Sequence, residues 1–129
     1  MSRCTFNDGR PTFVAGAEIA EGAPCLLKDG KLVPWTTADD SASLKAQVFF
    51  AQFGAEAGTP VSAMIAGNAS GTVLAPALAG EYVAGAPVYA ADGGKVSASG
   101  VRVVGTALES VSLSDAGTVH VVPQHVPAQ

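Results

Sequence analysis

The chain has 129 residues, a length typical of a single domain, and its net charge is −4 at pH 7. Only 14% of its residues are charged, compared with about 25% in typical soluble domains. No cluster of Lys and Arg is present to neutralise phosphates, which argues against nucleic acid as a partner. Because the exterior is so poor in charge, we expect much of it to contact copies of the chain or another protein.

The sequence shows no sign of export or of a membrane span. The opening residues, MSRCTFNDGR, have no apolar run after their charges, so we expect no signal peptide. Residues 57–80 carry no charge, but prolines and glycines interrupt them and argue against a transmembrane helix. Cys4 and Cys25 lack CxxC spacing, so we expect two reduced thiols.

We predict that the chain begins and ends with arms that carry no core pattern. Residues 1–14 hold polar and turn residues around Phe6 and Phe13. Residues 123–129 (PQHVPAQ) contain two prolines and form the predicted C-terminal tail. Between the two arms we expect one β domain over residues 15–122.

The first hairpin of this domain is predicted at residues 22–33. GAP at 22–24 precedes the apolar run CLL at 25–27, and proline is tolerated at the first position of a strand because its missing N–H is not needed there. Asp29-Gly30 separates this run from Leu32-Val33. Such a pair is typical of a two-residue hairpin turn, in which both residues adopt positive φ.

Further elements follow in chain order. Residues 37–40 (TADD) predict either one capped helical turn or a loop. Apolar or alternating patterns then predict strands at 47–53, 61–65 and 72–74.

The second half of the domain repeats the signals of the first. EYVAGAPV at 81–88 matches EIAEGAPC at 18–25, and a turn returns as Asp92-Gly93-Gly94, with one extra glycine. The same order of signals in both halves indicates one β unit that is used twice.

Two strands complete the second half. At 101–107 we expect Val101, Val103 and Ala107 on one face, alternating with Arg102 and Thr106 on the other. Around residue 120, Val119 and Val121 alternate with an outward-facing His120.

Short strands separated by Gly and Pro turns are typical of a small barrel or sandwich. We therefore predict an all-β fold, a small β-tulip-like barrel or sandwich with an extended N-terminal arm. It is built from two tandem repeated β units, at about residues 15–66 and 79–122.

No catalytic or metal-binding pattern is present, so we predict no enzyme, no metal and no cofactor. His120 and His125 lack further ligands at suitable spacing. Asp115 precedes His120, but no nucleophile-bearing turn such as GxSxG accompanies them. Asp39 and Asp40 are adjacent, so on an extended chain they point to opposite faces. The glycines match neither a Walker A nor a dinucleotide motif.

Four large aromatic side chains lie in the first half of the chain: Trp35, Phe49, Phe50 and Phe53. Core packing is the simplest interpretation, and a subunit interface is the alternative. Phe49 and Phe50 are adjacent, so in a strand they face opposite sides, and we expect a neighbouring chain to cover one of them. We therefore assign the four aromatics to a subunit interface.

Five stretches carry a resemblance to a known family. They are AGAEIAEGAPCLLKDGKLVP (15–34), AGTPVSAMI (57–65), GAPVYAADGGKV (85–96), VRVVGTALES (101–110) and AGTVHVV (116–122). Over residues 12–122 the chain resembles the decoration, or cement, proteins of tailed-bacteriophage heads, which are small and rich in β-structure. The chain departs from the family pattern at one place. In the family a VG-A-L phrase tends to appear in both halves, but here only the second half has it, as VGTAL at 104–108, and the first half has VFFAQ at 48–52.

The resemblance implies a homotrimer on the outer surface of the expanded capsid, between subunits of the major capsid protein. The protein would be made in the host cytoplasm and end in the virion, with no membrane or nucleic acid as partner. The resemblance also implies that the N-terminal arm grips the capsid, and it supplies no catalytic residues. By position, we assign five arm residues to the capsid contact: Arg3, Thr5, Phe6, Arg10 and Phe13.

A second interpretation is a binding module, the β-domain of a head fibre or tail adhesin that recognises a cell-surface glycan. Exposed aromatic platforms would favour it. With one Trp and two Tyr, the sequence gives this interpretation little support.

Overall fold

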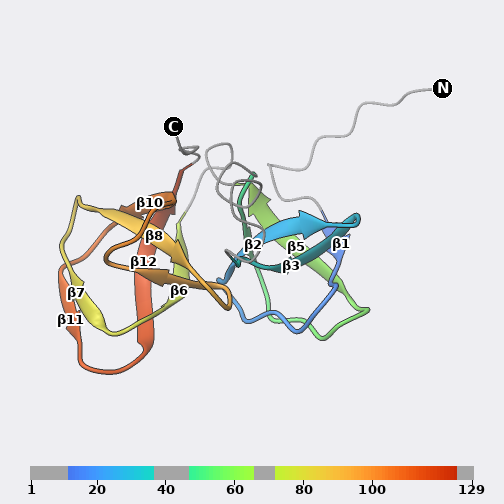
Figure 1. Cartoon of the computed structure of the whole chain (residues 1–129), viewed down its shortest axis with the longest axis horizontal. Coiled ribbons are helices and arrows are strands. Elements are labelled where there is room, and N and C mark those ends of the chain that lie inside the picture. The colour runs from blue at the N-terminus through green and yellow to red at the C-terminus, as the bar shows by residue number, and fades with distance from the viewer. Residues whose placement is uncertain (1–11, 37–46, 66–71, 125–129) are drawn as a thin grey trace.

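The computed structural model of the protein describes residues 12–36, 47–65 and 72–124. Within these ranges the chain forms twelve β-strands and no helix, arranged as two lobes that lie side by side (Figure 1). Residues 12–36 and 47–65 supply the first lobe, and residues 72–124 supply the second. The prediction of an all-β fold that contains a small barrel is confirmed.

The first lobe is a five-stranded sheet with the order β1-β5-β4-β2-β3. Every neighbouring pair in it is antiparallel. Its two end strands approach each other at a single parallel bridge between Ala15 and Leu32. The strands are β1 (Thr12–Val14), β2 (Pro24–Lys28), β3 (Lys31–Pro34), β4 (Phe49–Ala51) and β5 (Pro60–Ile65).

The second lobe is a closed barrel with the order β6-β12-β10-β8-β9. A parallel contact between β6 and β9, at Ala77 and Val96, completes the closure. A separate antiparallel pair, β7 with β11, lies beside it. The strands are β6 (Val73–Ala77), β7 (Gly80–Tyr82), β8 (Pro87–Ala91), β9 (Lys95–Ser97), β10 (Val103–Ala107), β11 (Val111–Leu113) and β12 (Gly117–Pro123).

Both predicted hairpins are present, and local turn chemistry explains them. Lys28 pairs with Lys31 across Asp29-Gly30, whose φ angles are 53° and 79°. These angles suit the mirror-image turns that match the twist of the flanking strands. In the second lobe, β8 and β9 are joined by Asp92-Gly93-Gly94. Pro24 and Pro87 are each the first residue of a strand, as expected.

The strands of the two lobes are paired in the same order. If the lobes are superposed by chain order, β1 to β5 correspond to β6, β8, β9, β10 and β12. The turns correspond as well, because Gly22 N–H donates to Ala51 O and Gly85 N–H donates to Ala107 O, both at 2.8 Å. These parallels favour tandem repeats. The lobes differ in closure, however, because the end strands of the first lobe meet at one bridge whereas the second lobe is a full barrel. The repeat therefore stays an interpretation.

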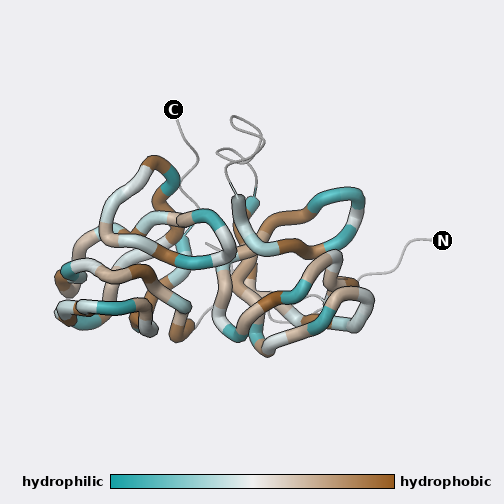
Figure 2. Tube along the Cα trace, turned by 60° about the horizontal axis from the view of Figure 1, so that its bottom comes forward, coloured by the Kyte–Doolittle hydropathy of each residue, from teal (hydrophilic) through white to brown (hydrophobic). Residues whose placement is uncertain are grey.

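Two hydrophobic clusters fill the molecule. The smaller lies inside the first lobe and includes Ile19, Cys25, Leu32 and Phe49. The larger fills the barrel and continues into the first lobe, from which it takes five side chains: Leu26, Trp35, Val48, Phe50 and Met64. In Figure 2 hydrophobic, brown segments run along strands of both lobes and also reach outer turns of the barrel lobe. The two lobes therefore share one core at their seam.

Two boundaries of the predicted domain need correction. Residues 12–14, predicted as part of the arm, form β1 and pair with β5. At the other end, Pro123 is the buried last residue of β12, and Gln124 N–H donates to Val104 O at 2.8 Å. The body therefore includes both segments, and residues 1–11 and 125–129 lie outside the described residues, as does the turn or loop expected at 37–40.

The alternation expected at 101–107 holds at Ala107, which is buried, but is wrong at Val101 and Arg102. Val101 is 71% exposed, whereas Arg102 is fully buried and Val104 lies in the core. The register of β10 against β8 shifts between Val103 and Gly105. Such a bulge inserts one extra residue, and one extra residue exchanges the two faces of a strand.

The seam depends on a glycine turn of the first lobe. Gly22 has φ 78°, and a Cβ added there would overlap the carbonyl oxygen of Leu74 on β6. Gly85, which precedes β8 as Gly22 precedes β2, has φ 88° and open space around it. Both glycines adopt a positive φ that residues with a side chain disfavour. Of the two, only Gly22 also needs the missing Cβ so that the two lobes can approach each other.

We predict that Gly22→Ala destabilises the protein more than Gly85→Ala. Each substitution costs about 1 kcal/mol for the positive φ. Gly22→Ala adds an overpacking cost of about 1–3 kcal/mol because the methyl group must displace β6. Urea unfolding of the two variants measures the difference, and equal losses would show that the lobes do not depend on this approach.

Cys25 lies in the first-lobe core, at the place that Val88 takes in the second lobe. It is fully buried, and its Sγ–H donates to Ala23 O at 3.3 Å. Burial raises the pKa of the thiol from 9.0 to about 12. A hydrogen bond with the backbone of Ala51 lowers this pKa, but its effect is smaller than that of burial. The folded state therefore holds Cys25 neutral in a range where the unfolded chain ionises it.

This difference predicts that stability falls as pH rises from 9 towards 12, because the unfolded state then binds fewer protons than the folded state. In a Cys4→Ser background, the Cys25 thiol contributes a loss of about 1.4 kcal/mol per pH unit over this window. Cys25→Val is the matched variant, because it keeps an apolar group at the site and removes the titration. If chemical unfolding gives parallel pH profiles for the two proteins, the burial argument is wrong.

Candidate functional site

The described part of the chain shows no cluster of metal-ligating side chains. No group of three or more His, Cys, Asp or Glu there is placed to hold a metal ion. His120 lies on the outer side of β12 as expected, and its Nε2 is 2.6 Å from Thr72 Oγ1. Asp39, Asp40 and His125 lie outside the described residues. No helix within the described ranges has the length and apolar character needed to cross a membrane.

The predicted capsid-contact residues fall into two groups. Arg3, Thr5, Phe6 and Arg10 lie outside the described residues, so their assignment stays a prediction. Phe13 lies in β1, half-buried, and its ring meets that of Phe49 edge to face, with the centroids 5.1 Å apart. Phe13 therefore anchors the start of β1 to the first-lobe core, and its ring is not free to serve as an arm residue.

The four aromatics assigned to a subunit interface also separate. Trp35, Phe49 and Phe50 are buried within the single chain. Phe49 and Phe50 do face opposite sides of β4, but Phe50 is covered by the second lobe of the same chain, not by a neighbour. The reason for placing these three at an interface is thereby removed. Phe53 is 60% exposed, and its assignment stays a prediction.

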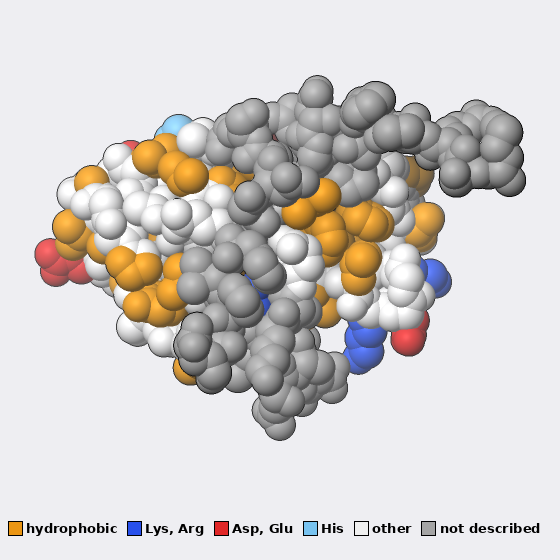
Figure 3. Space-filling model, turned by 90° about the horizontal axis from the view of Figure 1, so that it is seen from above, with side chains coloured by type: hydrophobic (Ala, Val, Ile, Leu, Met, Phe, Trp, Pro, Cys, Tyr) orange, Lys and Arg blue, Asp and Glu red, His pale blue; other side chains and the backbone are white. Residues whose placement is uncertain are grey.

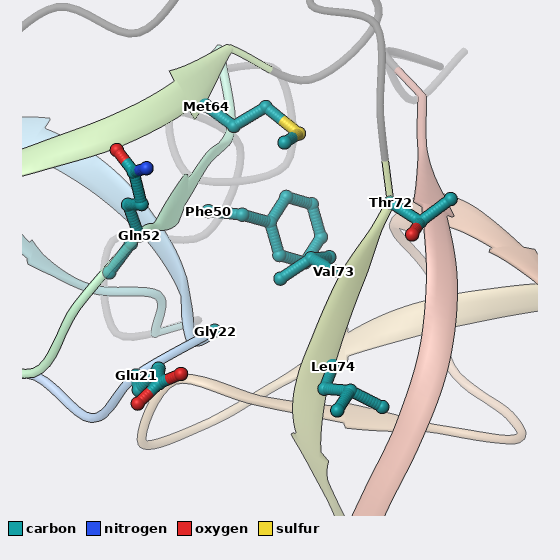
Figure 4. Close-up of a pocket in the computed structure, with 9 residues that line it drawn as sticks. Glu21, Gly22, Phe50, Gln52, Met64, Thr72, Val73 and Leu74 are labelled. Atoms are coloured by element: carbon teal, nitrogen blue, oxygen red, sulfur yellow. The ribbon is translucent and has the colours of Figure 1, made fainter.

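A cavity of about 210 Å³ opens at the seam between the lobes. Figure 4 shows Phe50 and Met64 pointing into it from the first lobe and Val73 facing them from β6. Its polar groups are those of Glu21, Gln52 and Thr72, besides the backbone. Glu21 is the one ionisable side chain among the described lining residues. The cavity has room for one side chain or a few waters.

The outer side of the barrel over β6, β12 and β10 forms a continuous uncharged surface, which we call the barrel face. Leu74, His120 and Leu108 make its central row, because His120 is paired with Leu74, and Leu108 N–H donates to His120 O at 2.9 Å. A second row holds Thr72, Val122 and Thr106. Thr118 and Pro76 extend the surface beyond the central row. Leu74 is 57% exposed and Leu108 is 44% exposed.

Sequence reasoning missed the barrel face, although the signal was present. The predicted strand at 72–74 stopped short of β6, which runs from Val73 to Ala77. Over its full length, exposed Leu74 and half-buried Pro76 alternate with buried Ala75 and Ala77. The same alternation around Ala107 leaves Leu108 outside. A longer window of period two would have placed both leucines outward.

Two polar side chains of the second lobe, those of Tyr82 and Arg102, are buried. The Tyr82 hydroxyl donates to Leu78 O at 2.7 Å and reaches Val96 O at 3.3 Å, and burial raises its pKa. Arg102 is fully buried, and burial lowers the pKa of its guanidinium.

The surface of the described residues carries few charges when it is seen from above (Figure 3). Most of it is white or orange, and the charged side chains lie mainly towards the two ends of the molecule.

No protein-family model matches the chain, and no curated protein matches its sequence.

Proposed function

We propose that the chain is a structural virion protein that binds the outer surface of the expanded phage head as a homotrimer and stabilises it. One observation carries the proposal: exposed large apolar side chains are spread over both lobes of a weakly charged β body. In the described residues these are Val14, Leu27, Phe53, Leu74, Val83, Val101 and Leu108.

Such a surface is suited to contact with other proteins. Each of these side chains would gain about 25 cal/mol for every Å² of apolar area that a partner covers. A charged partner surface would lose its bound water on contact and would find few opposite charges on the body to replace it. A weakly polar protein surface has few charges to desolvate, so it avoids this free-energy cost. A capsid lattice offers many such surfaces close together, so modest contacts can add up.

The position of β1 supports a gripping role for the residues before it. β1 pairs with β5 through Thr12, Phe13 and Val14, and the Phe13 ring packs on Phe49, so the start of the described chain is fixed to the body. An arm that leaves a fixed point can reach a capsid edge and add a strand to it. Three arms on one trimer would raise avidity by about 10²–10⁴ over one arm.

The first test is binding to heads. Purified protein is mixed with expanded heads and, separately, with unexpanded precursor heads, and each mixture is sedimented. We expect saturable binding to expanded heads only, together with release of the protein as the heads are returned to a precursor-like lattice. Protein that remains in the supernatant with both kinds of head would contradict the proposal.

A second prediction separates the arm from the body. Deletion of residues 1–11 is expected to abolish head binding while leaving the unfolding free energy unchanged within about 0.5 kcal/mol, because β1 remains. Deletion of residues 1–14 also removes Phe13 from the core and is expected to cost about 3 kcal/mol or more.

Sedimentation with heads and urea unfolding are measured on both deletions. Undiminished head binding after removal of residues 1–11 would refute the gripping role of the arm. Equal stability of the two deletions would refute the assignment of β1 to the body.

A further inference from the structure

The cavity at the seam between the lobes combines an apolar lining with polar groups. Phe50 and Met64 of the first lobe and Val73 of β6 supply the apolar part, and Figure 4 shows Val73 facing the other two. Glu21 and Gln52 lie on the first-lobe side of the cavity. A cavity of about 150 Å³ holds a molecule of benzene. The seam cavity, at about 210 Å³, therefore has room for one long side chain.

The fold does not use the polar side chains of this cavity. Within the described part of the chain, no hydrogen bond or ion pair engages the Glu21 carboxylate or the side-chain amide of Gln52. Gln52 is held by its backbone, because its N–H donates to Ser62 O at 2.8 Å. Glu21 precedes Gly22, whose N–H donates to Ala51 O at 2.8 Å. The backbone therefore places both side chains beside the cavity and leaves their polar ends available to a ligand.

β6 adds a backbone donor to the same cavity. His120 O accepts the hydrogen bond of Leu108 N–H, so the backbone groups of His120 point towards β10. Leu74 is paired with His120, and two residues paired in this way direct their N–H and C=O groups away from each other. The Leu74 N–H and C=O therefore point towards the first lobe, where a Cβ on Gly22 would overlap this carbonyl oxygen. In the described residues β9 pairs with β6 at Ala77 alone, so no strand lies beside the Leu74 N–H.

This set of groups matches a lysine side chain. A lysine has an apolar stem and a cationic end, and it buries the stem along apolar surface. Met64 and Val73 offer that surface. Glu21 offers the opposite charge, to which an ammonium group donates short, charge-assisted hydrogen bonds. The Leu74 N–H is placed to donate to a carbonyl oxygen in the backbone of the same lysine-bearing segment.

A lysine of a protein fits this cavity better than a free diamine does. Glu21 is the one ionisable side chain in the described lining, so a second ammonium group would find no counter-charge there. Pro76 is the next residue of β6 whose backbone faces the same way, and it has no N–H, so a long added strand cannot form at this edge. We therefore propose that the seam cavity binds one lysine side chain, presented by a short extended segment of a partner protein.

Peptide binding to the isotope-labelled full chain tests the site. The probe is acetyl-Gly-Lys-Gly-amide, and the control peptide carries norleucine, which keeps the stem and lacks the ammonium group. We expect the lysine peptide to shift the NMR signals of Gly22, Leu74 and the Gln52 side chain in a saturable way. It should bind about tenfold or more tightly than the norleucine peptide. Equal binding of the two peptides, or no saturable shift of these signals, would overturn the proposal.

A matched pair of variants tests the role of the carboxylate. Glu21→Gln removes the charge at the cavity and keeps the shape of the side chain, so it is expected to weaken binding of the lysine peptide about tenfold or more. Glu56→Gln removes the same charge at an exposed residue outside the cavity lining and is expected to leave the affinity unchanged. Equal weakening in both variants would show general attraction to the acidic chain and would refute the site.

A third variant tests the cavity itself. Val73→Phe places a larger side chain in the cavity and leaves Glu21 in position, so it is expected to abolish binding of the lysine peptide. Urea unfolding establishes that the variant is folded, and undiminished binding by the folded variant would overturn the proposal. If this variant does not fold, the Glu21→Gln and Glu56→Gln pair decides.

Two further probes test the chemical class of the ligand. The arginine peptide acetyl-Gly-Arg-Gly-amide carries a planar guanidinium group in place of the compact ammonium. Cadaverine is a free diamine with a similar apolar stem. Both are expected to bind more weakly than the lysine peptide. If either binds as tightly, the assignment of the cavity to a protein lysine is wrong.

Only the identity of the partner rests on the proposed function, in which the capsid supplies the lysine. Glu21→Gln is then expected to bind expanded heads more weakly than Glu56→Gln does, and equal binding would refute the capsid as the source. If the wild-type chain binds heads but not the lysine peptide, the decoration role stands and the lysine site is refuted. If the lysine peptide binds in the cavity and heads do not bind, the lysine site stands and the decoration role fails.

Discussion

Burial of Phe50 and Trp35 between the two lobes is the interaction on which the rest of the structure depends. β4 is covered on both sides, with Phe49 in the first-lobe core and Phe50 in the core shared with the barrel. Full burial of each large side chain contributes about 1.5–3 kcal/mol. Trp35 adds backbone contacts, since its carbonyl oxygen accepts hydrogen bonds from Gly93 and Gly94 at the β8–β9 turn. The lobes therefore form one body.

This seam decides which surfaces remain for partners. A first lobe standing alone would expose Phe50, Trp35 and Met64, and would be expected to associate through them. Because the second lobe covers them, the large apolar side chains left exposed in the described residues are spread over both lobes, and one of them, Leu74, borders the seam cavity. The seam cavity is small and has one carboxylate, Glu21, beside it. The contact with other proteins that we propose would use the apolar side chains that stay exposed outside this shared core.

Local chemistry predicted some features of the fold well. The turns at Asp29-Gly30 and Asp92-Gly93-Gly94 were found from sequence, because residues that tolerate positive φ between apolar runs specify a hairpin without reference to the rest of the chain. The outward position of His120 followed from alternation with two buried valines. The pairing order of both lobes and the strands β7 and β11 did not follow, because they depend on contacts distant in the sequence.

The candidate site was harder to predict for the same reason. Adjacent phenylalanines correctly indicated a strand covered on both sides, but pattern alone cannot tell a neighbouring chain from a second lobe of the same chain. At Arg102, a bulge in β10 exchanged the faces of the strand, which periodicity cannot anticipate. The arm assignment of Phe13 failed because three residues of β1 are too few to show a pattern.

The most direct test of the account is a density map, by electron cryomicroscopy, of expanded heads incubated with the purified chain. The account predicts added two-lobed densities in groups of three on the outer surface. Bare heads would contradict it.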